Sequence, residues 1–304
     1  MRVTNTMMRR DSIQRLQTNL QAIERAQRQI SSGRRVELMS DDPSAASEVI
    51  RLSSSLRAID QFRRNVRTGE ARGAAAENAL TNMGTTLDRA IELAISQAST
   101  TATADTRLAT KAEVDQLLGY AVGLGNTKLG DTWIFSGSRG TEAPFQVPPT
   151  PTDPFTALRD ALGDPVNPYG NPRVEIGDGM SIAPNPNGTE AFLDTGAFEA
   201  LRALSTALGA NDVPGIAAAQ TALQTAGRSL QGVLGGLGAR TNELQNASDT
   251  LEASETSITI FRSDLRDVEV EKAISELSGR QTAYQAAMLA TSRVMGQSLA
   301  DYLR

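Results

Sequence analysis

Residues 216–268 read IAAAQTALQTAGRSLQGVLGGLGARTNELQNASDTLEASETSITIFRSDLRDV, and this stretch decides the fold. Every seventh residue from Ile216 to Leu265 is large and aliphatic. A heptad repeat sustained over this length predicts a long helix that packs against other helices. We expect the repeat to supply the core of a helical rod, from Leu223, Leu230, Leu237, Leu244, Leu251, Ile258 and Leu265.

Four glycines interrupt the middle of this repeat, at 232, 235, 236 and 238. Glycine inside a helix costs about 1 kcal/mol relative to alanine. The sequence therefore predicts a local distortion of the helix near residue 235.

Two further helices precede the repeat. Asp42-Pro43 is typical of an N-cap followed by a first-turn proline, and one heptad phase runs from there through Val49 to Ala94. This pattern predicts a helix over 43–98 that would be about 80 Å long at 1.5 Å per residue, and a third helix over about 105–129.

The middle of the chain has a different composition. Thr132-Trp133-Ile134-Phe135 is a short β-prone run, and ten of the twelve prolines fall between 144 and 186. Proline at this density excludes helix, so residues 137–195 are predicted to form a small β-rich insert. Its apolar content is thin, and a weakly packed insert is the alternative. Helix is predicted again near 197 and after Pro214.

The two ends of the chain carry weaker helical patterns, over 13–30 and 270–302, in which polar residues such as Gln27, Gln281 and Ser298 interrupt the apolar ones. Helices of this kind have low stability alone. We therefore expect them to contact other copies, through Ile13, Leu16, Leu20, Ile23, Ile30, Ile274, Leu277, Tyr284, Met288, Met295, Leu299 and Tyr302.

Charge differs between the two ends. Residues 1–35 carry eight arginines against Asp11 and Glu24, a local charge of +6, whereas residues 264–276 have a local charge of −3. Opposite charges favour pairing of the terminal segments, within one chain or between copies. The alternatives are that these runs are solvated faces, or that the basic N-terminus is an export or membrane-surface signal.

Composition excludes several classes of function. The chain has no cysteine and therefore no thiolate nucleophile, and it has no histidine, which is the commonest general base and the commonest metal ligand. The acidic cluster around 264–271 is the one candidate for an enzyme site, and it is better interpreted as a turn or a solvated face. We expect no catalytic, cofactor or metal site and no enzyme activity. The net charge of −5 argues against nucleic-acid binding, and no apolar run is long enough for membrane insertion.

Together these patterns predict a mainly α protein, a long antiparallel hairpin or bundle of helices formed by both chain ends. We expect three parts: a terminal domain of 1–40 with 268–304, a rod of 41–136 with 196–267, and the β-rich insert of 137–195.

Several short motifs support a family assignment. They include Met1-Arg2-Val3-Thr4 with Met7-Met8, the run Ser32-Gly33-Arg34-Arg35, the run Ser40-Asp41-Asp42-Pro43, Leu237-Gly238-Ala239-Arg240-Thr241-Asn242, and the ending Asp301-Tyr302-Leu303-Arg304. In combination they resemble the flagellin superfamily, and within it most the hook–filament junction proteins. Filament flagellin is the main alternative, although it usually lacks this opening. A secreted coiled-coil scaffold or type III effector is a more distant one.

The resemblance implies a structural protein exported unfolded through the flagellar type III apparatus to the outside of a bacterium. It implies an inner tube of terminal helices, a shell of longer helices and an outer insert. The implied partners are other copies of the chain, a hook-associated protein on the hook side, flagellin on the filament side and an export chaperone. We also expect the terminal helices to become fully ordered only when copies pack.

Overall fold

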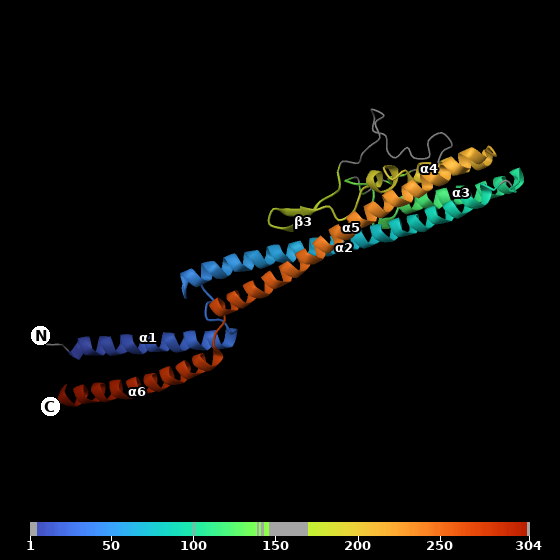
Figure 1. The fold of residues 1–304 in the computed structure, drawn as a ribbon. Coiled ribbons are helices and arrows are strands. Elements are labelled where there is room, and N and C mark those ends of the chain that lie inside the picture. The colour runs from blue at the N-terminus through green and yellow to red at the C-terminus, as the bar shows by residue number, and fades with distance from the viewer. Residues whose placement is uncertain (1–4, 100, 139, 141–142, 146–169, 303–304) are drawn as a thin grey trace. The chain divides into compact units, whose positions relative to one another are not determined.

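The computed structural model describes residues 5–99, 101–138, 140, 143–145 and 170–302, and it describes side chains through most of this range but not at 5, 6, 8, 9 and 293–302. The fold is mainly α, as predicted, with small antiparallel strand pairs (Figure 1). The chain forms two compact units. Unit 1 contains Met1–Ala58 and Ala253–Arg304, and unit 2 contains Ile59–Glu252. The three-part division expected from the sequence stays a prediction.

Six α-helices make up most of the described chain. They are α1 (Asn5–Ser32), α2 (Pro43–Gln97), α3 (Ala104–Gly125), α4 (Ala197–Gly209), α5 (Val213–Arg266) and α6 (Val270–Tyr302). Helices α2 and α5 each run through both units, so each unit combines an early and a late part of the chain.

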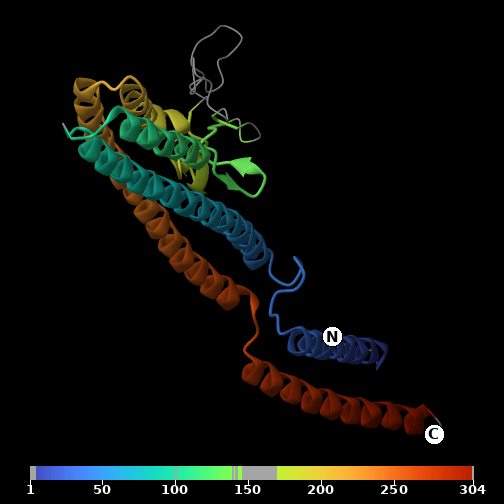
Figure 2. The same ribbon diagram turned by 90° about the vertical axis from the view of Figure 1, so that its right-hand side faces the viewer.

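The core of unit 2 lies between α2 and α5, with α3 and α4 packed beside each other against it (Figures 1 and 2). Leu230 of α5 lies beside Gly84 of α2, and Leu244 lies beside Gly69. Because the later α5 residue meets the earlier α2 residue, the two helices run antiparallel in this unit.

The predicted distortion near residue 235 is wrong, since α5 is continuous from Val213 to Arg266. All four glycines of 232–238 are exposed, and a Cβ atom added to any of them would meet no atom within 4 Å. They lie away from the core, whereas Leu230 and Leu237 are 1% exposed. Burial of these flanking leucines outweighs the helix-propensity cost of the glycines.

Helix α3 ends at Gly125, earlier than the predicted 129. Asn126 ends it, because its side-chain amide pairs with the backbone of Phe145, donating to the carbonyl at 2.8 Å and accepting from the N–H at 2.9 Å. The chain then turns into a hairpin of β1 (Lys128–Leu129) and β2 (Thr132–Trp133), in which Gly130 supplies the positive φ of the turn.

Four of the seven phenylalanines gather beside this hairpin and are buried. Four pairs of rings among Phe135, Phe145, Phe192 and Phe198 are in contact, with ring centroids 5.0–5.7 Å apart. A few aromatic side chains concentrated at one place close the junction between the long helices and the insert.

The described part of the insert is small. It contains the hairpin of β3 (Val174–Gly177) and β4 (Met180–Ile182) and a π-helical turn, η1 (Thr189–Leu193). Glu190 of this turn forms an ion pair with Arg240 of α5 at 2.9 Å, and the buried Asn185 donates to the carbonyl of Ile134. These contacts hold the end of the insert against α5 and the segment that follows β2. Residues 146–169 lie outside the described residues.

Candidate assembly surface

Helices α1 and α6 pack side by side in unit 1 and run in opposite directions (Figures 1 and 2). Burial along α6 repeats with spacings of 4 and 3, and burial along α1 has the same rhythm. The inward residues are Ser12, Leu16, Asn19, Ile23, Ala26 and Ile30 of α1, and Ala273, Leu277, Arg280, Tyr284, Ala287 and Thr291 of α6. They occupy the a and d positions of a heptad, as in an antiparallel coiled coil.

The predicted contact residues divide between two positions of this heptad. Leu16, Ile23, Ile30, Leu277 and Tyr284 occupy a positions and are buried or half-buried between α1 and α6.

The neighbouring e positions hold the other large apolar residues, and these are exposed. The exposed fractions are 47% for Ile13, 43% for Leu20, 53% for Ile274 and 49% for Met288. The side chains of Met295, Leu299 and Tyr302 lie outside the described side chains. The d positions, which complete the inward stripe, carry small or polar residues such as Ala26 and Ala273, so apolar periodicity did not identify them.

The expected rod core lies in two environments. Leu223, Leu230, Leu237, Leu244 and Leu251 are at most 8% exposed within unit 2, whereas Ile258 and Leu265 are half-buried within unit 1. The heptad of α5 is therefore buried most completely where α2, α3 and α4 surround it.

The α1–α2 loop and the α5–α6 linker form a joint within unit 1. Arg34 and Asp267 make an isolated antiparallel bridge. Across it, Arg35 N–H donates to the Arg266 carbonyl at 2.7 Å, and Val268 N–H donates to the Gly33 carbonyl at 3.0 Å. Gly33 follows the last residue of α1 and has a φ of +69°, which glycine adopts readily at the end of a helix. Main-chain hydrogen bonds therefore join the α1–α2 loop to the α5–α6 linker.

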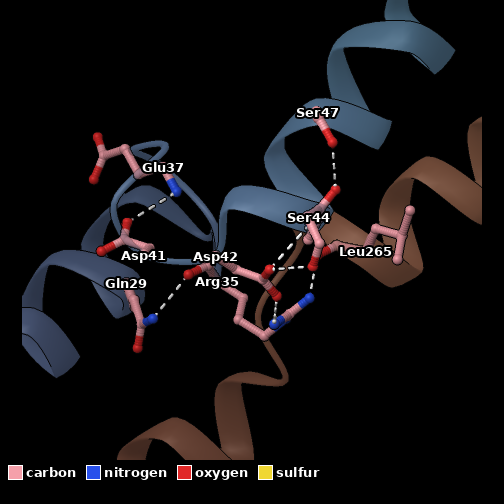
Figure 3. Close-up of polar contacts among 9 residues, drawn as sticks. Gln29, Arg35, Glu37, Asp41, Asp42, Ser44, Ser47 and Leu265 are labelled. Atoms are coloured by element: carbon pink, nitrogen blue, oxygen red, sulfur yellow. Dashed lines mark hydrogen bonds and ion pairs between the residues drawn. The ribbon is translucent and has the colours of Figure 1, made fainter.

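Arg35 connects the end of α5 to the start of α2 at this joint (Figure 3). In the structure its Nη2 donates to the Leu265 carbonyl at 2.6 Å, and its Nη1 lies 3.5 Å from Asp42 Oδ2. Leu265 is in the last turn of α5, where carbonyls have no partner within the helix. Arg35 therefore caps the end of α5 beside the start of α2, which a sequence pattern alone does not reveal.

The aspartates of the joint are held in the charged form. Asp42 is the N-cap of α2, as predicted, and accepts from the Ala45 N–H and the Ser44 hydroxyl, which lower the pKa of its carboxyl. The Leu38 N–H, aided by that of Glu37, lowers the pKa of Asp41.

Asp267 lies on the linker side of the joint. Hydrogen bonds from Arg266 Nε and the Ser263 hydroxyl lower the pKa of its carboxyl. Carboxylates that accept such bonds stabilise a local structure only while they are ionised.

A hollow of about 520 Å³ lies beside the joint. Acidic side chains dominate its lining, and they include Asp264, Asp267, Glu269 and Glu276. Arg35, Lys272 and Gln29 are also part of its wall. The hollow lies along one side of the α1–α6 pair, close to where both helices leave the joint.

The two chain ends match family models. Residues 3–138 match the bacterial flagellin N-terminal helical region, and residues 220–303 match the bacterial flagellin C-terminal helical region. Together these matches cover most of the chain and both members of the α1–α6 pair.

Individual relatives agree with these models. Flagellar hook-associated protein 3 of Escherichia coli is 26% identical over 89% of this chain and 90% of the relative. A flagellin of Halalkalibacterium halodurans is 25% identical over 94% and 93%. The fold is similar to that of flagellar hook associated protein-3 from Legionella pneumophila, with a TM-score of 0.58 and 13% identity over 71% of this chain and 99% of that one.

A mainly α fold whose two ends pair as helices and match both flagellin regions defines the class: the chain belongs to the flagellin family. It is a self-assembling structural protein of the bacterial flagellum and not an enzyme. Across the described residues, no helix has the length and hydropathy needed to cross a membrane.

Proposed function

We propose that this chain joins the flagellar hook to the filament, and that the paired α1 and α6 helices are the contacts between copies. The observation that carries the proposal is the α1–α6 pair itself. It leaves large apolar side chains exposed on both helices, including Ile274 and Met288. Exposed apolar surface of this kind is typical of a protein–protein contact.

The choice of the junction over the filament rests on sequence. The opening Met1-Arg2-Val3-Thr4 with Met7-Met8 and the ending Asp301-Tyr302-Leu303-Arg304 favour the junction proteins. The full-length similarity to a hook-associated protein 3 supports the same choice, although flagellins match at similar identity. Filament flagellin therefore remains the second candidate.

The proposed neighbours follow from this position. A hook-associated protein would contact the chain on the hook side and flagellin on the filament side. Export would proceed through the flagellar type III apparatus with the help of a chaperone, and the terminal helices would become fully ordered on assembly.

Cells that lack this protein test the proposal. We expect electron microscopy to show hooks without filaments, while a separate flagellin accumulates in the medium as unassembled subunits. Gold-labelled antibody against the protein should mark only the boundary between hook and filament in wild-type cells.

Filament flagellin would give the opposite pattern. Antibody would label the filament along its length, and no other major subunit would accumulate in the medium of the deletion strain. Either result would overturn the junction role.

A further inference from the structure

The α1–α6 pair has two flanks of different character. In an antiparallel pair, a two-fold axis perpendicular to both helices relates one to the other, so equal heptad positions fall on the same flank. The e positions of both helices therefore share one flank, and the g positions share the other.

The e flank carries the large apolar residues. Ile13 and Leu20 come from α1, and Ile274 and Met288 come from α6, all more than 40% exposed. Ile13 on α1 and Met288 on α6 both lie 21 residues along the chain from the antiparallel Arg34–Asp267 bridge. Large apolar side chains of both helices thus occupy four of the six described e positions, and Gln27 and Gln281 occupy the other two.

The g flank carries alanine at three of its six described positions and Arg15, Gln29 and Glu276 at the others. Ala22 of α1 and Ala283 and Ala290 of α6 occupy g positions, and each is at least partly accessible. Gln29 and Glu276, also at g positions, line the hollow of about 520 Å³ beside the joint. The alanines leave room for large apolar side chains from another molecule, whereas the hollow at the end of this flank has a charged and polar lining.

We propose that the e flank of one copy docks on the g flank of the next copy. Large apolar side chains on one flank fit against alanines on the other, which is the complementarity that helix packing requires. The occupant is a second copy because this protein self-assembles and carries both complementary flanks on its own surface.

Such a contact is heterologous, because two different surfaces meet. Each copy then has one donor flank and one acceptor flank, so addition continues around a ring or a helix. A contact between two e flanks would instead close at a dimer and leave the g flank unused. This inference rests on the proposed function and specifies its interface.

Cysteine cross-linking tests the polarity of the contact, because the natural chain has no cysteine. Cells lacking the native gene would co-express Met288→Cys and Ala283→Cys, one substitution per chain. Isolated flagella would be oxidised, or treated with a short bismaleimide, and separated without reduction. We expect a cross-linked dimer from the mixture and none from either variant alone.

A single chain carrying both substitutions should give a ladder of multimers. Residues five apart on a helix are separated by about 7.5 Å along its axis, so they do not form a disulfide with each other. Ala290→Cys tests the same flank one heptad further along α6. Ile274→Cys replaces Met288→Cys if the Met288→Cys chain is not incorporated into flagella.

Thr282→Cys is the matched control. It is exposed and adjacent to Ala283, but it occupies the outward f position and should not link to Met288→Cys. Dimers from Met288→Cys alone would show an e-to-e contact and overturn the inference. Equal cross-linking of Thr282→Cys to Met288→Cys would also overturn it. The inference would be overturned as well if no cross-link formed in flagella where antibody still marks the hook–filament boundary. Absence of that boundary label would instead contradict the proposed function.

Discussion

The heptad of α5 in unit 2 and the heptad of the α1–α6 pair have the same spacing but different burial. Leu223, Leu230 and Leu237 are at most 1% exposed, because α2, α3 and α4 surround this part of α5. In unit 1, Ile274 and Met288 are about half exposed beside α1. Periodicity therefore predicts a helix, whereas the number of neighbouring helices decides whether its apolar residues form a core or a surface for another molecule.

Adding charge to the exposed heptad should have the largest effect. Ile274→Asp with Met288→Asp places two carboxylates on the e flank, where they would be desolvated on assembly. We expect complete loss of incorporation into flagella and of motility. The free energy of unfolding should change by about 1 kcal/mol or less, because both sites are exposed in the single chain.

Motility assays and urea unfolding of the purified chain measure the two effects separately. Thr282→Asp, on the outward face of α6, is the matched control and should leave motility intact. Normal motility of the double variant would contradict the importance of this flank.

Removing a large side chain from the buried heptad should give the opposite result. Leu244→Ala creates a cavity beside Gly69, and we expect a loss of about 2–5 kcal/mol in the stability of unit 2. Leu289→Ala, at a site that is 64% exposed, should cost less than about 0.5 kcal/mol. If urea unfolding showed equal losses in the free energy of unfolding for the two variants, the distinction between the buried and the exposed heptad would be wrong.

Acid should open the joint before it unfolds unit 2. The folded pKa values of Asp41, Asp42 and Asp267 are lowered, so their contribution is complete above the ordinary value of about 3.9 and is lost as the pH falls through the folded values. Protection of the Arg35 and Val268 amides from hydrogen exchange, corrected for intrinsic rates, should fall below about pH 4.

Asp267→Asn is the matched variant for this test. It removes one titrating group, so the change in amide protection with pH should become smaller. Protection that stays constant from neutral pH to well below the ordinary aspartate value would contradict the role of these carboxylates.

The smallest expected effect concerns the glycines of α5. Gly235→Ala adds a Cβ with no atom within 4 Å, and should stabilise the helix by about 1 kcal/mol. Gly125→Ala should destabilise instead, since its Cβ would lie 2.5 Å from Phe145 Cδ2. Thermal unfolding compares the two, and destabilisation by Gly235→Ala would mean that its open face is covered.

Much of this fold follows from the sequence alone. The long helices, the Asp42 cap and the end of α1 at Gly33 rest on local signals, which depend on neighbours within a turn. The inward d positions of the α1–α6 pair were missed because Ala26 and Ala273 give no apolar signal.

Contacts between distant parts of the chain were also missed. The bond between Arg35 and the Leu265 carbonyl joins residues 230 positions apart, and no local pattern specifies such a partner. The phenylalanine cluster likewise brings together side chains from a loop, the insert and α4.

Both units are built from an early and a late part of the chain, and this has a consequence for the order of folding. Leu80 and Met83 share a core with Leu230 and Leu237, so roughly 150 residues must be available before these contacts can close. In unit 1, α1 can pair with α6 only when α6, almost the last segment of the chain, is available. If the chain passes N-terminus first through the proposed export apparatus, unit 2 can therefore close once Leu237 has emerged, whereas α1 can pair with α6 only after nearly all of the chain has left.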